Sequence, residues 1–187
     1  MKNPEDSSAA EAGLASVPED FPWPIVLGID PGTLVVGYGA LVCRGVEPRF
    51  LAAGTLRAPR SASVPERLGV LSREFDLILE RLRPRVVVLE EAFAARNVQS
   101  ALRIGEGRGM LLAAAVRFGA EVVQFPPAVA KKAVAGNGRA SKEQVAAMVA
   151  RSLGLTEAPK PLDASDALAL ALAHVYKSRS RAVSPSR

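Results

Sequence analysis

Three apolar runs near the start of the chain have the length and composition of β-strands. Residues 25–30, 36–43 and 49–56 are rich in Val, Leu and small or aromatic residues. Glycine, proline and charged residues separate them, and such punctuation is typical of tight turns between neighbouring strands. The pattern therefore predicts a three-stranded antiparallel meander.

The rest of the chain alternates between helical and strand patterns. Residues 85–90 and 121–125 predict two further strands, and each follows a helical segment, as strands of parallel sheets do. Apolar residues at three- and four-residue spacings, together with capping residues, predict the helices. These are expected over residues 65–83, 97–118, 127–135, 141–153 and 162–176. The fold class is mixed α/β.

The two ends of the chain differ in composition from the middle. Residues 1–22 are rich in Ser, Ala, Glu and Pro without apolar periodicity, which predicts a flexible acidic tail. Residues 178–187 carry basic side chains and no acid, which predicts a basic C-terminal tail. One folded domain is expected between them, over residues 23–177.

Composition narrows the class of protein further. A chain of 187 residues with 49% hydrophobic residues can bury the core of one ordinary domain. No apolar run approaches the roughly 18 residues of a membrane span, and the N-terminus lacks the layout of a secretory signal, so a cytoplasmic protein is expected. The net charge is +5 although residues 1–24 are acidic, so the folded part is strongly basic. A polyanionic partner such as nucleic acid fits that charge.

Four carboxylates lie at the ends of apolar segments. Asp30 and Glu90 each close an apolar run, and Asp163 and Asp166 open the last helical stretch, three residues apart on one helix face. If the four converge, divalent cations with a preference for oxygen ligands would offset their repulsion. Two ions at such a site support phosphodiester hydrolysis. The sole histidine, His174, lies eight residues beyond Asp166 and is expected to be structural.

Each of these acids also has an ordinary structural explanation. Asp163 as N-cap and Asp166 in the first turn would favour a helix start without any metal. Asp30 before Pro-Gly has the composition of a common turn. Glu90 and Glu91 point to opposite faces of a strand, so only one of them is expected to face the cluster, and the residues alone do not say which.

Several segments together identify a family. They are Gly28-Ile29-Asp30-Pro31-Gly32, Gly37-Tyr38-Gly39, Glu90-Glu91-Ala92-Phe93 with Asn97, residues 127–145, and Asp163-Ala164-Ser165-Asp166-Ala167-Leu168-Ala169. In this order and spacing, residues 25–176 resemble a RuvC-type Holliday-junction resolvase of the ribonuclease H-like superfamily. The resemblance implies a ribonuclease H-like fold: a five-stranded mixed sheet, three strands antiparallel and then two parallel, with helices on both faces.

The resemblance also implies an activity. Such a protein is a homodimeric, Mg²⁺-dependent endonuclease that resolves four-way DNA junctions by paired symmetrical nicks, in homologous recombination and DNA repair. Mn²⁺ substitutes for Mg²⁺, with two ions expected at each site, and a branch-migration complex of the RuvA–RuvB type is an expected partner. Asp30, Glu90, Asp163 and Asp166 match the catalytic, metal-binding positions, with Glu90 chosen over Glu91 on the resemblance.

The same resemblance assigns DNA contacts. Lys131 and Lys142 match basic residues near the scissile phosphate, Phe93 matches an aromatic residue that stacks on exposed bases, and Arg96 is a candidate phosphate contact nearby. Taken alone, Phe93 would be interpreted as a core residue.

Glycines also mark the long helical stretch over residues 97–118. Gly105, Gly107 and Gly109 fall inside a helix rather than directly after a strand, so close helix packing explains them better than a phosphate-binding loop. This helix is the candidate for much of the homodimer interface.

Alternative functions remain open. A catalytically inactive junction-binding protein would keep the basic face, and a ribonuclease H-like RNA-processing nuclease would share the first acidic strand. The segment from Lys131 to Val145 argues against the RNA-processing enzyme. An actin-like ATPase is disfavoured because the chain is short and lacks a second glycine loop after a strand.

Overall fold

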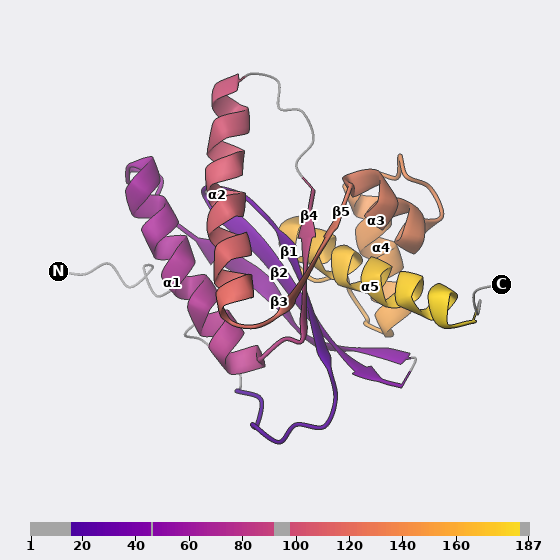
Figure 1. Cartoon of the computed structure of the whole chain (residues 1–187). Coiled ribbons are helices and arrows are strands. Elements are labelled where there is room, and N and C mark those ends of the chain that lie inside the picture. The colour runs from indigo at the N-terminus through magenta and orange to yellow at the C-terminus, as the bar shows by residue number, and fades with distance from the viewer. Residues whose placement is uncertain (1–15, 46, 92–97, 184–187) are drawn as a thin grey trace.

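One five-stranded sheet organises the computed structural model, which describes residues 16–45, 47–91 and 98–183 (Figure 1). The strand order is β3-β2-β1-β4-β5. The strands are β1 (Ile25–Asp30), β2 (Val35–Arg44), β3 (Glu47–Arg57), β4 (Val86–Glu90) and β5 (Glu121–Phe125). All five predicted strands are present, with β2 and β3 slightly longer than their apolar runs.

Strand direction follows from the connections. Short turns join β1 to β2 and β2 to β3, and both pairs are antiparallel. Helices intervene before β4 and β5, and the pairs β1–β4 and β4–β5 are parallel, as crossover connections require. The predicted mixed sheet is therefore confirmed. In the β1–β2 register, Asp30 lies opposite Gly37 and Gly28 lies opposite Gly39.

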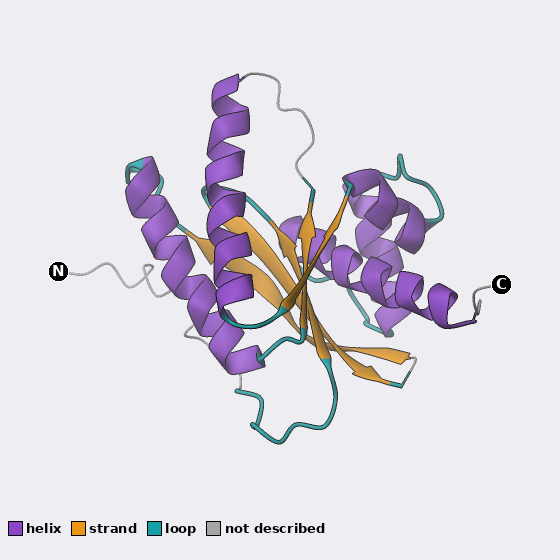
Figure 2. Cartoon of the chain, in the orientation of Figure 1, coloured by secondary structure: helices purple, strands orange, loops and turns teal. Residues whose placement is uncertain are grey.

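Helices cover both faces of the sheet (Figure 2). They are α1 (Val64–Leu82), α2 (Val98–Arg117), α3 (Pro127–Ala135), α4 (Lys142–Leu153) and α5 (Leu162–Val183). Alternation along β1 divides the core, because Leu27 packs in the cluster with α1 and α2 while Val26 packs in the cluster with α3, α4 and α5. Within the described ranges, no helix is long and apolar enough to cross a membrane.

The two ends of the folded part differ from expectation in detail. Helix α5 runs past the predicted end at residue 176 to Val183, so the stretch predicted as a basic tail begins inside the helix. Lysine and arginine are good helix formers, and cations near a helix C-terminus are favourable, which explains the extension. At the other end, Val17 and Phe21 pack against the core, and the Val17 N–H donates to the Arg81 carbonyl at 2.8 Å.

Candidate metal centre

Helix α5 lies unusually close to β1 and β2 because glycines face it. A Cβ built on Gly28 would lie 1.9 Å from the carbonyl oxygen of Ala167, and one on Gly37 would lie 2.2 Å from that of Asp163. No side chain fits at either position. The glycines of the two sequence motifs thus let the first turns of α5 rest on the sheet beside Asp30.

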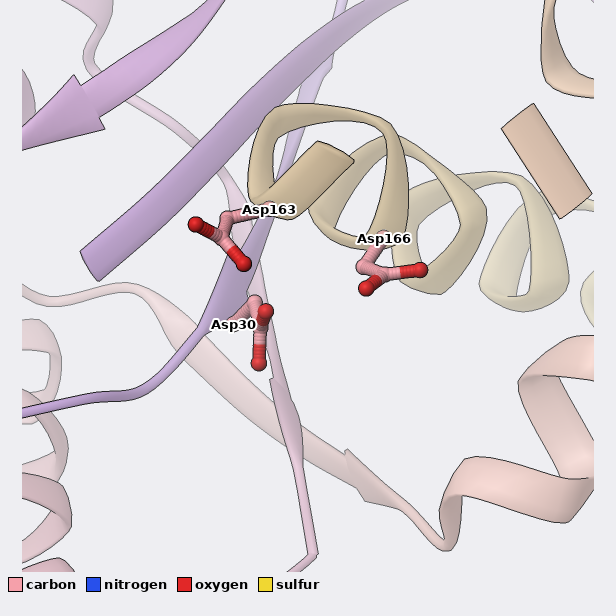
Figure 3. Close-up of side chains that lie close together, drawn as sticks. All are labelled: Asp30, Asp163 and Asp166. Carbon is pink, nitrogen blue, oxygen red and sulfur yellow. The ribbon is translucent and has the colours of Figure 1, made fainter. Parts of the chain in front are cut away.

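Three aspartates meet where α5 crosses the end of β1 (Figure 3). Ligand oxygens of Asp30, Asp163 and Asp166 all lie within 4.8 Å of one another. Asp30 ends β1, whereas the other two project from the first turns of α5, more than a hundred residues later. The chain therefore brings these three predicted site residues together.

Glu90 stands slightly apart from the three aspartates. It ends β4, and its side chain lines a cavity of about 170 Å³ together with Asp30, Asp166 and Lys142. It does not belong to the set of oxygens within 4.8 Å of one another. Val88 packs on the α5 side of the sheet, so alternation places Glu90 on that side and Glu91 on the other. Glu90, rather than Glu91, is thus the acid that faces the cluster.

Burial and mutual repulsion perturb the acids. Burial, followed by the charges of Glu90 and Asp166, raises the pKa of Asp30 from 3.8 to about 7. The pKa of Glu90 is also raised, first by burial and then by the charge of Asp166. A cluster of carboxylates that resist ionisation together is unfavourable unless a cation joins them. The site therefore calls for positive charge.

Lys142 supplies positive charge at this point of the structure. Its Nζ lies 2.7 Å from Oδ2 of Asp166 and 3.6 Å from Oδ1 of Asp163. Burial opposes its ammonium form, but the hydrogen bond to Asp166 and the three aspartate charges outweigh that effect and raise its pKa. Lys142 is the first residue of α4, where a cation opposes the helix dipole. The attraction of Asp163 and Asp166, and not the dipole of α4, therefore explains why the Lys142 ammonium lies here.

A capping box fixes the backbone beside Lys142. Ser141 is the N-cap of α4, as predicted; its Oγ accepts from the N–H of Gln144 at 3.2 Å, and the Gln144 side chain accepts from the N–H of Ser141 at 2.9 Å. This arrangement holds the first turn of α4 against the acids.

The other predicted DNA contacts are placed only in part. Nζ of Lys131 donates to the carbonyl of Ala140 at 2.9 Å and lines the same cavity as Asp30 and Glu90. Lys131 and Lys142 thus flank the acids. Phe93 and Arg96, predicted to contact DNA, lie outside the described residues.

Two structural alternatives can be compared with the geometry. Helix α5 begins at Leu162, so Asp163 is already helical and is not its N-cap. His174 is half-buried and lines a different, larger cavity of about 610 Å³, with Arg85 and Glu121 at the starts of β4 and β5. Burial lowers its pKa, which favours the neutral form expected of a structural histidine.

Two residues at this end of the sheet escaped the sequence analysis. Arg108 of α2 is buried, and it donates to the backbone carbonyl of Glu90 and to Oε1 of Gln124. A signal was present, because Arg108 precedes buried Leu111 and Ala115 by three and seven residues and so lies on the inner face of α2. An arginine on the apolar face of a helix is unusual enough to single out.

The donor set fits a hard divalent cation. Three carboxylates within 4.8 Å of one another, with a fourth in the same cavity, supply the oxygen ligands that Mg²⁺ and Mn²⁺ prefer. A lysine ammonium already bonded to two of them shows that the cluster accepts a cation. Among the described residues, neither histidine nor cysteine contributes to the group.

Comparisons with known proteins agree with this fold and site. The family model "Crossover junction endodeoxyribonuclease RuvC" matches residues 26–174. The chain is 42% identical over 157 residues to the RuvC crossover junction endodeoxyribonuclease of Chlorobium chlorochromatii, over 84% of this chain and 82% of that relative. The Thermus thermophilus RuvC structure matches with a TM-score of 0.75 and 37% identity, over 83% of this chain and 96% of that one. T. thermophilus RuvC in complex with a Holliday junction substrate also matches with a TM-score of 0.75, at 34% identity over 84% of this chain and 96% of that one. This chain belongs to the RuvC crossover junction endodeoxyribonuclease family.

Proposed function

We propose that the protein is a metal-dependent endonuclease that resolves four-way (Holliday) DNA junctions by paired symmetrical nicks, in homologous recombination and DNA repair. The observation that carries the proposal is the meeting of Asp30, Asp163 and Asp166 within 4.8 Å in a chain of this family. The solved complex of a T. thermophilus relative with a Holliday junction supports the choice of substrate.

In this proposal Asp30, Glu90, Asp163 and Asp166 would hold two ions of Mg²⁺, or of Mn²⁺ in its place, at each active site. When bound, a metal pair supplies an activated water and stabilises the leaving oxygen of the phosphodiester. Asp30 and Asp166 are the ligands best placed to be shared between ions, because each is close to the other two aspartates and lines a cavity with Glu90. The four carboxylates would hold such ions beside the DNA backbone, and Lys142 would then no longer be needed to neutralise Asp163 and Asp166.

The lysines beside the acids fit the proposed DNA backbone contacts. Once released from Asp166, the ammonium of Lys142 is free to bind the scissile phosphate, and Lys131 flanks the same cavity. Both would neutralise phosphate charge and give binding a steep salt dependence. Phe93 stacking on an opened base, and Arg96 on a nearby phosphate, complete the proposed DNA contacts.

The outer face of α2 supports a homodimer. Val98, Leu102, Gly105, Gly109 and Val116 recur at spacings of four, three, four and seven residues and therefore share one face. Val98 is 75% exposed, Leu102 61% and Val116 63%. A Cβ on Gly105 or Gly109 would meet nothing within 4 Å, so close packing inside the described chain does not explain these glycines. A second copy of α2 packed on this stripe would, and a two-fold junction needs two symmetry-related sites.

A branch-migration complex of the RuvA–RuvB type is the proposed partner that delivers the crossover. A resolvase needs the junction held open at the nicking point, which a motor that moves the crossover provides. This part of the proposal rests on the family alone.

One assay separates the candidate functions. The full-length protein is incubated with a synthetic four-way junction, matched duplex and single strand, with and without Mg²⁺. Paired nicks in the junction alone, and only with Mg²⁺, are expected. Tight junction binding without nicking would favour an inactive binding protein, and preferential cutting of structured RNA would favour an RNA-processing nuclease.

A further inference from the structure

Arg108 occupies an unusual environment on α2. With 7% exposure, it is the one buried charged side chain among the residues that the structure describes. Burying a guanidinium is costly unless its donors are satisfied. Both recorded acceptors are neutral: the backbone carbonyl of Glu90 and the side-chain carbonyl of Gln124. No carboxylate in the described part of the chain forms an ion pair with Arg108, although its charge acts on Glu90 and lowers the pKa of that acid against the larger effect of burial.

The two acceptors lie on neighbouring strand ends. Glu90 is the last residue of β4, and Gln124 is the penultimate residue of β5. The planar fork of an arginine bonds two oxygens at a fixed separation, which a single ammonium does not do. Arg108 therefore ties the carboxyl ends of β4 and β5 together.

The end of β4 has little other support on its β1 side. Pairing of β1 with β4 stops at Ile29 and Leu89, one residue before Glu90. On the β5 side, pairing continues to Glu90 and Phe125. Arg108 thus donates to Glu90, the residue of β4 that no longer pairs with β1.

Arg108 reaches this point from the face opposite the acids. Leu89 packs in the cluster under α1 and α2, and Gln124 is its partner in register, so Gln124 lies on the α2 side. The Glu90 side chain points the other way, into the cavity with Asp30 and Asp166. The guanidinium holds the Glu90 backbone from behind while the carboxylate faces the metal centre.

The preceding residue of α2 contacts the loop after the other acidic strand. A Cβ on Gly107 would lie 3.5 Å from Cγ2 of Thr33 and 3.6 Å from the carbonyl oxygen of Gly32, directly after Asp30 and Pro31. Residues 107–108 therefore abut the loop after β1 and the last residue of β4.

We infer that Arg108 is a positioning residue for the metal centre: its fork on the Glu90 carbonyl and Gln124 fixes the end of β4, from which the Glu90 carboxylate faces Asp30 and Asp166 in their shared cavity. The inference rests on the proposed function. It assigns to α2 an internal role in the active site beside the proposed dimer role of its outer face.

The test compares Arg108→Lys and Arg108→Gln with the wild-type protein. Mn²⁺ binding without DNA is measured by electron paramagnetic resonance, junction cleavage is followed across a Mg²⁺ titration, and junction affinity is measured in Ca²⁺. Both variants should bind Mn²⁺ about 10- to 100-fold more weakly, the range typical when a residue supporting a metal ligand is lost. The Mg²⁺ midpoint of cleavage should rise equally, excess metal should restore the rate, and junction affinity should stay unchanged. Arg117→Ala, on the same helix but in an exposed ion pair with Asp76, is the matched control and should behave as wild type.

Distinct outcomes would overturn the inference. A wild-type metal midpoint in both Arg108 variants would do so, and so would full recovery by Lys, because charge alone would then suffice. If both variants fail to fold, Gln124→Ala, which removes one acceptor at an exposed position, should show a smaller shift in the same direction. An unchanged midpoint there would assign Arg108 to folding alone. A wild-type protein that cuts no junction would refute the proposed function, whereas the Mn²⁺ measurement still decides the role of Arg108.

Discussion

The ammonium of Lys142 lies 2.7 Å from the carboxylate of Asp166, although the two residues belong to different helices. The side chain of Asp166 is 18% exposed and that of Lys142 is 51% exposed, so the pair sits at the mouth of the acidic cavity. The lysine thereby occupies the region where a divalent cation would contact Asp163 and Asp166. Without metal, it offsets part of the repulsion among the aspartates.

Replacing Lys142 should therefore lower the stability of the metal-free protein and increase the additional stability that Mg²⁺ confers. In Lys142→Ala the aspartates lose their internal cation, so the metal-free protein should melt at a lower temperature. Mg²⁺ should then raise the melting temperature more than in wild type, because no ammonium competes for the carboxylates. Cleavage should fall, and the salt dependence of junction binding should flatten. Thermal melts with and without Mg²⁺, with exposed Lys132→Ala as the control, measure the effect; an equal Mg²⁺ shift in both variants would contradict it.

The raised pKa of Asp30 predicts an unusual pH dependence. An aspartate whose pKa is higher in the folded than in the unfolded protein stabilises the fold fully below pH 3.8, and this contribution is lost as pH rises through about 7. The rise from 3.8 to about 7 corresponds to at most roughly 4 kcal/mol. Metal-free wild type should thus lose stability between pH 4 and 8 relative to Asp30→Asn.

Denaturant unfolding at several pH values without metal measures this difference. Mg²⁺ should restore wild-type stability at high pH and leave Asp30→Asn little changed. The variant should also bind junction DNA without cutting it, because the substitution removes a metal ligand but leaves Lys131 and Lys142 in place. If the free energy of unfolding of the two proteins changed with pH in parallel, the ionisation of Asp30 would not destabilise the fold, which would contradict the prediction.

Gly37 is expected to be intolerant of a side chain. In Gly37→Ala the new methyl group would meet the carbonyl oxygen of Asp163 at 2.2 Å, so the start of α5 must move away from β2. Metal affinity and cleavage should both fall. The control is Gly69→Ala in α1, where the nearest atom is an arginine Nη1 at 3.7 Å and alanine should stabilise the helix by up to about 1 kcal/mol. Equal metal affinity in the two variants would mean that α5 does not depend on this close contact.

The sequence predicted the elements well because each has a strong local signal. Apolar runs marked the five strands, and Ser141 and Gly154 marked the two ends of α4. The length of α5 was underestimated because its last turns are basic rather than apolar, and helix propensity there outweighs the absence of a buried face. Local signals of this kind depend only on neighbouring residues.

The geometry of the site was less accessible to sequence. That Asp30 meets Asp163 and Asp166 more closely than Glu90 depends on how far α5 sinks onto Gly28 and Gly37. The pairing of Lys142 with Asp166 and the clamp of Arg108 on Glu90 join remote segments, and no local pattern encodes either contact. The family resemblance supplied the identity of the acids, and the fold supplied their spacing.

The exposed stripe on α2 predicts self-association. Leu102→Glu would place a charge at its centre, so a dimeric wild type should become monomeric by analytical ultracentrifugation. Arg103→Glu, on the neighbouring face of the same helix, introduces the same residue off the stripe and should leave the dimer intact. A Leu102→Glu variant that remains dimeric would place the interface elsewhere.

A crystal structure of the protein soaked in Mn²⁺, with anomalous diffraction collected at the manganese edge, tests the metal centre most directly. The account predicts anomalous peaks among Asp30, Asp163 and Asp166, with a peak also in contact with Glu90 and with Lys142 displaced from Asp166. Carboxylates without a peak, with Lys142 still bonded to Asp166 at saturating Mn²⁺, would contradict it.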